Sequence, residues 1–488
     1  MRRLTFRAAL FAASSSVILV AGLEPSSAES TRGSGLERAS KHARIVEHWT
    51  PSRRAAAIPR DLVRDTRGQA YLRRSDGSLE PYGRRIAEAA GGAGKITPNA
   101  KPGGDTTVPS ISNLNPANNA TIGASHTFQA TVTDASGLRS VRFTVQKQGA
   151  AAQSFTAALS ANNVWTAALS GFTDGSWSWR VVAKDKANNT ATSPTVNFLV
   201  STGGGGGGDD TVENAPWTGG GDVQQAVGRL YFEMPGNKRR SRWVGYVCSG
   251  TVVADGTSGR SVILTASHCV YDDANKAFAR NVLFIPDQDG TSGAGTDLNC
   301  NNDPLGCWTA AFGVVDVNWT TRTFPDNIAW DYAFYVVDDS NAHTGTGSHT
   351  ALDGAVEPLP ASFAPPAVDD GVVGGASPDF THALGYSYSD DPNFMYCAED
   401  LTTEGEVNWW LPSCGLSGGS SGGPWVQDMS NGTGDIVSVN SWGYTGSPGM
   451  AGPMLSGTSA ACVFSESKSD TPALPAADGD EGLIATCP

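Results

Sequence analysis

Cysteine is absent from the first half of the chain, and long amphipathic helices are scarce throughout. All eight cysteines lie between Cys248 and Cys487. An even number confined to one region predicts a separate, disulfide-stapled domain in the second half. The scarcity of helical repeats, together with 58 glycines and many short alternating runs, argues against a helical bundle and favours a mainly β protein.

Basic residues are also fewer than acidic residues. The chain has 34 Lys and Arg residues against 48 Asp and Glu residues, which gives a formal net charge of −14. This balance argues against nucleic acid as a main partner and suits a soluble protein. A length of 488 residues predicts two to four structural segments.

The N-terminus has the pattern of a secretory signal peptide. Basic residues at Arg2, Arg3 and Arg7 precede an apolar run over 8–23 and a small-residue cleavage site at 26–28. We therefore expect residues 1–28 to be removed and the protein to be secreted. A retained N-terminal anchor is the alternative, and no later run is long and apolar enough to cross a bilayer.

Residues 29–105 are rich in arginine and poor in large apolar side chains. Such a segment cannot bury much core by itself. One interpretation is a pro-segment that docks on the acidic remainder and is later removed. The other is a solvated, partly disordered leader.

Residues 106–201 change character and predict a small antiparallel β-sandwich. The pattern resembles the bacterial immunoglobulin-like (Ig-like) modules of exported enzymes and adhesins, which would serve either as a binder of a surface or matrix ligand or as a spacer. The predicted strands are His126–Thr133, Ser140–Gln146, Ser154–Leu159, Val164–Leu169, Trp177–Ala183 and Thr195–Val200. A glycine-rich linker over 202–210 separates this module from the last domain, 211–488.

Two adjacent serines, Ser420 and Ser421, stand between two glycine pairs in the stretch Leu416–Trp425. A hydroxyl on a tight glycine turn is a candidate nucleophile, and the same glycines let backbone N–H groups converge on an oxyanion. Upstream, His268 ends an expected strand beside a cysteine. Asp331 heads a strongly apolar run, where a partly buried carboxylate can orient an imidazole; Asp326 is a competing acid.

Four motifs resemble the signatures of the chymotrypsin/trypsin-like serine peptidases. They are Thr265–Cys269, Asp331–Phe334, Gly419–Pro424 and Ser441–Gly443, in that family's order of His, Asp and Ser. The resemblance covers roughly residues 226–463. It implies an all-β fold in which residues 211–488 form a double six-stranded β-barrel, preceded by the Ig-like sandwich.

The resemblance also implies a set of roles. His268 would be the general base, Asp331 its orienting acid and Ser421 the nucleophile, with an oxyanion hole from the backbone N–H groups of Gly419 and Ser421. An acyl-enzyme would form, and neither a metal nor a cofactor is expected. Protein or peptide substrates would be the partners of a monomeric enzyme. The substrate-binding residues would be Gly415, Asn440, Ser441, Trp442 and Gly443, the last three as an edge strand that pairs with extended substrate.

The chain departs from the family pattern at three positions. Ser420 stands where trypsin has the aspartate that pairs with a new N-terminus, so activation by that route is not supported. Gly415 supplies no charge at the expected base of the specificity pocket. The chain resembles glutamyl endopeptidases around His268, but Asn440 replaces their specificity histidine. An apolar or medium-sized side chain is the expected preference.

Two other serine hydrolase families match parts of the sequence. A G-x-S-x-G motif centred on Ser420 would suit an α/β-hydrolase, but that fold needs its histidine after the serine, and no histidine follows His382. Residues 457–461 are similar to the serine turn of subtilisins but lack the other signatures of that family. An inactive, protease-like surface-binding protein remains the alternative function.

The family bridge across the histidine loop predicts the disulfide Cys248–Cys269. Sequence proximity then suggests Cys300–Cys307 and Cys397–Cys414, which leaves Cys462–Cys487.

Overall fold

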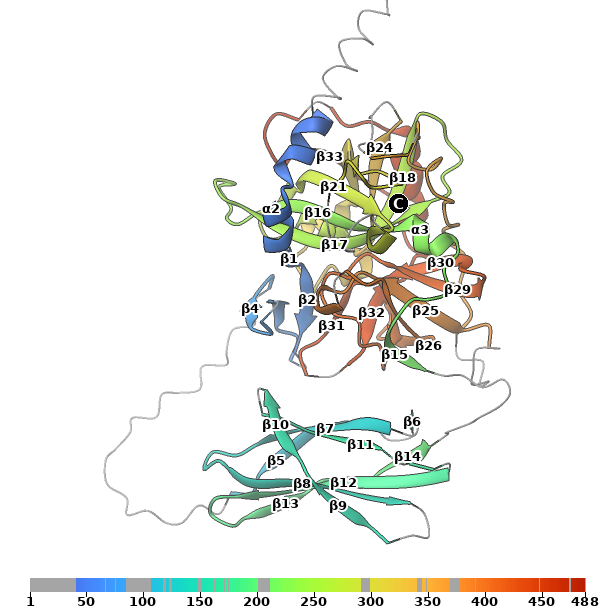
Figure 1. Ribbon diagram of the computed structural model, residues 1–488. Coiled ribbons are helices and arrows are strands. Elements are labelled where there is room, and N and C mark those ends of the chain that lie inside the picture. Colours follow the sequence, from blue (N-terminus) through green and yellow to red (C-terminus); the bar gives the residue numbers. More distant parts are fainter. Residues whose placement is uncertain are drawn as a thin grey trace, which may run out of the picture.

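The computed structural model describes residues 41–200 and 211–487, with internal gaps of which the longest are 85–106, 291–298 and 369–376. The predicted signal peptide and the whole of the glycine linker lie outside the described residues. Strands dominate the described chain, and helices are few and short (Figure 1). The all-β prediction is confirmed.

One mainly antiparallel sheet curves into the first barrel of the region 211–488. Its strands follow the order β21-β16-β17-β18-β24-β23, with β22 and β33 extending the two ends. The bounds are β16 (Val227–Pro235), β17 (Trp243–Val253), β18 (Arg260–Thr265), β21 (Arg280–Pro286), β22 (Trp308–Thr309), β23 (Phe312–Asp316), β24 (Ala333–Asp338) and β33 (Gly482–Ala485). A small hairpin joins β19 (Tyr271–Asp272) to β20 (Ala277–Phe278).

The second barrel is built from two sheets that lie against the first barrel (Figure 1). One has the order β15-β26-β25-β29-β30, and the other contains β27-β28-β32-β31. The bounds are β15 (Val212–Pro216), β25 (Phe380–Gly385), β26 (Met395–Asp400), β27 (Thr402–Glu404), β28 (Asn408–Leu411), β29 (Pro424–Ser430), β30 (Thr433–Val439), β31 (Trp442–Tyr444) and β32 (Met450–Pro453).

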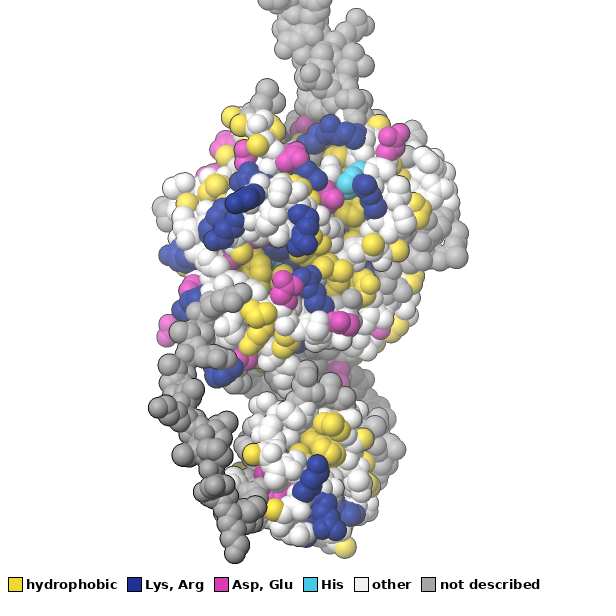
Figure 2. Space-filling view, turned by 90° about the vertical axis from the view of Figure 1, so that its left-hand side faces the viewer, with side chains coloured by type: hydrophobic (Ala, Val, Ile, Leu, Met, Phe, Trp, Pro, Cys, Tyr) yellow, Lys and Arg dark blue, Asp and Glu magenta, His cyan; other side chains and the backbone are white. Residues whose placement is uncertain are grey.

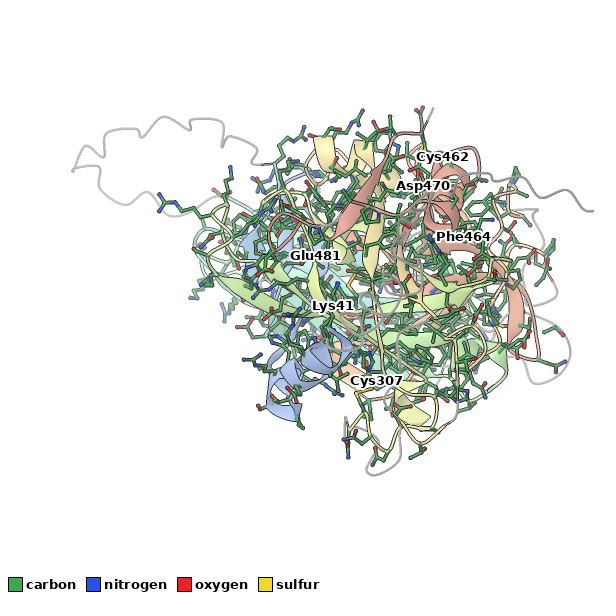
Figure 3. The ribbon with its side chains drawn as sticks, turned by 90° about the horizontal axis from the view of Figure 1, so that it is seen from above. Lys41, Cys307, Cys462, Phe464, Asp470 and Glu481 are labelled. Carbon is green, nitrogen blue, oxygen red and sulfur yellow. A yellow bond between two sulfur atoms is a disulfide. The ribbon has the colours of Figure 1, made fainter. Side chains whose placement is uncertain are left out.

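Three short helices pack on strands of the first barrel. They are α3 (Asp222–Ala226), α4 (Val317–Thr321) and α5 (Ala460–Ser469). On α5, the Phe464 ring lies 5.2 Å from the ring of Phe334, and Cys462 is bonded to Cys487. Figure 3 shows Cys462, Phe464 and Asp470 along this helix. Within the described residues, no helix has the length and apolar character needed to span a membrane.

Residues 110–200 form a sandwich of two sheets with its own core. One sheet has β5 (Ser110–Asn115), β7 (Ser125–Thr133), β10 (Ala158–Ala161) and β11 (Val164–Ser170). The other has β6 (Ala120–Ile122), β8 (Leu138–Lys147), β9 (Gln153–Thr156), β12 (Gly175–Asp185), β13 (Thr190–Thr192) and β14 (Val196–Val200). The single strand predicted over 154–159 is wrong, because residue 157 separates β9 from β10 and these strands belong to different sheets.

Residues 41–84 pack on both barrels. Residues 41–48 are helical, and α2 (Pro51–Ala56), β1 (Ile58–Pro59), β2 (Asp61–Arg64), β3 (Ala70–Arg73) and β4 (Leu79–Pro81) follow. β1 pairs with β17 of the first barrel and β2 with β31 of the second. The described part of this basic segment therefore lies against the barrels, where it buries Trp49 and Leu62 at 2% and 0% exposure.

Ion pairs between the segment and the barrels complement this apolar contact. Lys and Arg side chains are prominent on this side of the molecule, among fewer acidic ones (Figure 2). The pairs are Arg60–Asp272, Arg64–Glu404 and Arg84–Asp326, and His48 Nε2 contacts Glu233 Oε1 at 3.2 Å. At the start of the segment, Lys41 donates to the carbonyl of Ala311 at 3.3 Å and interacts electrostatically with Glu481 of the C-terminal tail (Figure 3).

Candidate active site

His268 lies in a 3₁₀ turn, Ser267–Cys269, rather than at the end of a strand as predicted. The preceding strand β18 ends at Thr265, and Ala266 separates it from this turn. The Cys248–Cys269 disulfide ties this turn to β17, and His268 has 0% exposure. A residue held by a disulfide and full burial has little freedom to change orientation.

Asp331 fixes the imidazole of His268 through both of its oxygens. Its Oδ2 lies 2.7 Å from His268 Nδ1, and its Oδ1 accepts the backbone N–H of His268 at 2.8 Å. The hydroxyl of Ser441 also donates to Asp331 Oδ2. An anionic Asp331 accepting these three bonds places the proton of neutral His268 on Nδ1 and leaves Nε2 free to accept another proton. Asp326, the competing acid, instead pairs with Arg84 at 3.1 Å and is half exposed.

Ser421 stands in a turn that only glycine-rich sequence can form. Gly419 and Gly422 have φ values of +98° and +82°, which disfavour any side chain. A Cβ at Gly422 would lie 2.0 Å from Oγ1 of Thr265, on the strand before His268. The absence of a side chain there lets the turn approach the histidine region closely. The carbonyl of Ser421 accepts the backbone N–H of Ser249 at 2.8 Å, which joins the two barrels at this point.

The backbone N–H groups of Gly419 and Ser421 each follow a carbonyl that already accepts a hydrogen bond. The carbonyl of Gly418 accepts the N–H of Tyr388 at 2.8 Å, and the carbonyl of Ser420 accepts the N–H of Gly423 at 2.9 Å. In a trans peptide the next N–H points the opposite way, which applies to Gly419 and Ser421. Among the described residues, neither of these N–H groups donates a hydrogen bond. Both are therefore available to a ligand oxygen.

His268 and Ser421 lie in the same small region without a direct hydrogen bond. Nε2 of His268 is buried and has no partner among the described residues. The neighbouring Cys269 Sγ lies 3.8 Å from the carbonyl oxygen of Ser421, and Ser421 itself is 5% exposed. Catalytic hydrogen bonds are often long or absent until substrate binds, so this geometry is consistent with a nucleophile–base pair.

A cavity of about 140 Å³ opens beside Ser421. It is lined by Gly415, by residues 416–418 and by Ser441, Trp442 and Gly443, together with Met450. No charged side chain of the barrels lines it. Asn440 is not among the lining residues: its amide accepts from Trp425 Nε1 at 2.8 Å and donates to the carbonyls of Leu384 and Ser420 at 2.8 and 3.0 Å. Its side chain therefore stabilises the serine turn through the carbonyl of Ser420 and does not face the cavity.

Strand β2 covers the mouth of this cavity. It runs parallel to β31, with Leu62 opposite Trp442 and Val63 opposite Gly443. Asp61 and Val63 line the cavity together with Ser421. Burial raises the pKa of the Asp61 carboxyl above its usual value, although Arg73 and His268 act in the opposite direction. The segment thus occupies the edge strand that the sequence assigns to substrate.

All four expected disulfides form. They are Cys248–Cys269, Cys300–Cys307, Cys397–Cys414 and Cys462–Cys487, and no described cysteine is free. Cys414 immediately precedes Gly415, so the third bridge also anchors the wall of the cavity.

The sequence did not indicate which residues cover the site. Asp61 and Val63 sit in a short run between arginines, without a motif, and nothing local predicts that they pair with β31. Glu404 and Tyr444, which hold Arg64 of β2, were missed for the same reason. Tyr444 directly follows the Ser-Trp-Gly motif, and this was the one feature of the sequence that indicated a longer edge strand.

The solved structures to which this chain is similar include two proteases. No family model matches the chain, and no curated protein matches it. The structure is similar to that of the thermostable serine protease AL20 from an extremophilic microorganism, with 26% identity and a TM-score of 0.39 over 51% of this chain and 99% of that one. It is also similar to the protease Anisep from Arthrobacter nicotinovorans, with 24% identity and a TM-score of 0.39 over 53% of this chain and 100% of that one.

Proposed function

We propose that the protein is a secreted serine endopeptidase made as a latent precursor. The observation that carries this proposal is the arrangement around His268. Asp331 binds Nδ1 at 2.7 Å, and Nε2 is left buried and unpartnered near a glycine turn that bears Ser421.

In the reaction, the Ser421 hydroxyl attacks the substrate carbonyl and passes its proton to Nε2 of His268. The N–H groups of Gly419 and Ser421 stabilise the resulting oxyanion. The imidazolium then protonates the leaving amine as the C–N bond breaks, and an acyl-enzyme remains on Ser421. Water, deprotonated by His268, hydrolyses this ester and regenerates the enzyme. Asp331 stabilises the transient imidazolium throughout.

Latency follows from the position of β2 in the cleft. A substrate cannot pair with β31 while Leu62 and Val63 occupy that edge. Removal of the basic segment would expose Ser421, which is 5% exposed in the full chain. Export by the signal peptide and the presence of four disulfides suit this role outside the cell.

Labelling by a fluorophosphonate tests the proposal, because this reagent reacts with an activated serine. The processed wild-type protein and Ser420→Ala should be labelled and should hydrolyse casein. Ser421→Ala should do neither. Ser420 is a matched control, since its adjacent hydroxyl donates to the carbonyl of Ser417 at 2.8 Å and takes no part in the chemistry. An unlabelled wild-type protein, or a labelled Ser421→Ala variant, would contradict the assignment.

A further inference from the structure

The Arg64 side chain of β2 lies in a site built by the second barrel. Its Nη2 donates to Glu404 Oε1 at 3.0 Å and to the Tyr444 hydroxyl at 2.7 Å. The guanidinium carbon lies 4.1 Å from the ring centroid of Trp442 and 5.1 Å from that of Tyr444. One carboxylate and two aromatic rings therefore surround a single cation, which is the chemistry that recognises arginine.

The receiving groups are held in place by the barrel itself. The Tyr444 hydroxyl donates to Glu404 Oε1 at 2.6 Å, so these two residues are joined without Arg64. Trp410 packs against both rings, with centroids 6.3 Å from Trp442 and 5.7 Å from Tyr444. A Cβ at Gly449 would lie 2.2 Å from the Trp410 ring, so the absence of a side chain at this position allows the indole to pack against Gly449. The site therefore keeps its shape when the segment leaves.

The site is continuous with the substrate cleft. Trp442 and Tyr444 belong to β31, the edge strand that borders the cavity beside Ser421. Tyr444 stands three residues after Ser441, which corresponds to about 10 Å along an extended strand. A peptide that enters the cavity with one side chain would place a residue about three positions away against Tyr444.

We infer that Glu404, Trp442 and Tyr444 form a substrate subsite for a basic side chain, with arginine preferred, about three residues from the scissile bond. Arg64 occupies this subsite in the precursor. The inference rests on the proposed peptidase function and adds a specificity that the primary cavity does not provide, because the barrel residues lining that cavity carry no charge. Arginine is preferred over lysine because its planar guanidinium stacks on Trp442 while donating to two oxygens.

Peptide profiling of the enzyme processed from the full-length chain tests this inference. Fluorogenic peptides carry one arginine moved stepwise through the positions on both sides of the cleaved bond, and matched peptides carry the uncharged isostere citrulline. We expect kcat/KM to be at least tenfold higher for arginine at one position about three residues from the bond. Glu404→Gln should reduce this ratio to near one. Glu406→Gln, an exposed acid in the same hairpin turn, should keep it.

The outcomes separate the two claims. Hydrolysis without an arginine preference, or a preference that persists in Glu404→Gln, would overturn the subsite while leaving the peptidase assignment intact. Absence of both peptide hydrolysis and Ser421 labelling would overturn the peptidase function and the subsite with it. Fluorophosphonate labelling of Glu404→Gln shows whether that variant is folded.

Discussion

Asp331 and Glu399 are buried carboxylates of the region 211–488, and they differ in the number of hydrogen bonds that they accept. Asp331 accepts from the His268 backbone, from Nδ1 of its ring and from Ser441. Glu399 on β26 is 5% exposed and accepts the backbone N–H of Ser413 at 2.8 Å. Burial raises the pKa of Glu399 to about 7, with the hydrogen bonds acting in the opposite direction. Asp331 is thus suited to stabilise a positive charge on the His268 ring. Ionisation of Glu399, in contrast, costs free energy in the folded state.

Asp331→Asn should lower kcat on the order of 10⁴-fold, because an amide can donate to Nδ1 and stabilise the wrong imidazole tautomer. The measurement is peptide hydrolysis by the processed enzyme. Asp326→Asn is the matched control: the Asp326 side chain is half exposed, its Arg84 partner belongs to the removed segment, and the change should leave kcat within about twofold of wild type. Loss of activity in Asp326→Asn with retention in Asp331→Asn would transfer the role to Asp326.

Glu399→Gln should change the pH dependence of stability. The folded-state pKa of about 7 exceeds the ordinary value of 4.5, so the wild-type protein is most stable with respect to this group below pH 4.5 and loses that stability as pH rises to about 7. The loss amounts to about 3 kcal/mol. Glutamine keeps a carbonyl for the Ser413 N–H and does not ionise. Its free energy of unfolding relative to wild type should therefore rise between pH 5 and 8.

Denaturant unfolding in a Ser421→Ala background, which prevents self-digestion, measures this difference. A difference that stays constant over the pH range would contradict the environment described for Glu399.

At the scale of elements, the segment over 58–64 connects the two barrels across the cleft. Arg60, the residue between β1 and β2, is 1% exposed and donates to the Tyr82 hydroxyl at 2.8 Å. Its guanidinium lies 3.7 Å from Asp272 and 5.2 Å from the Tyr246 ring centroid. A fully buried cation with these partners anchors the strand that covers the candidate active site.

Arg60→Ala should loosen β2 and increase the rate of fluorophosphonate labelling of the unprocessed full-length chain at least tenfold. Removing one partner of a buried ion pair costs roughly 3–5 kcal/mol, which exceeds what this change in rate requires. Arg67→Ala is the control, because Arg67 is 77% exposed and pairs with Asp65 of its own turn. Equal labelling of the two variants would show that this anchor does not restrain the segment.

At the scale of the whole molecule, the sandwich and the barrels have separate hydrophobic cores. Trp179 lies at the centre of the sandwich, 1% exposed, with its ring 5.0 Å from Phe128 and 5.3 Å from Phe143. Its Nε1 donates to the carbonyl of Pro116 at 2.9 Å. Separate cores predict that the two parts unfold as separate units.

Trp179→Ala should destabilise the sandwich by about 3–5 kcal/mol and leave the barrels unaffected. Calorimetry of the full chain should show two transitions, of which only one moves to lower temperature, and the labelling of Ser421 should not change. A single transition that shifts as a whole would contradict the independence of the two cores.

Local patterns in the sequence determined the all-β class and most strand positions of the sandwich, while the family resemblance and sequence proximity supplied the disulfide pairs and the residues proposed for catalysis. These features depend on period-two alternation, turn residues and short motifs, all of which act over a few neighbours. The tertiary structure shows His268 in a 3₁₀ turn and Asn440 turned away from the cavity, because packing around the serine turn sets both orientations.

Only the tertiary structure decided what covers the candidate site. Arg64 and Tyr444 are 380 positions apart, yet they share a hydrogen bond of 2.7 Å. Strand pairing over such a separation depends on the shape and charge of both partners, and no local signal specifies it. The sequence identified a basic segment and a candidate catalytic serine. The tertiary structure shows that strand β2 of this segment covers the cavity beside Ser421.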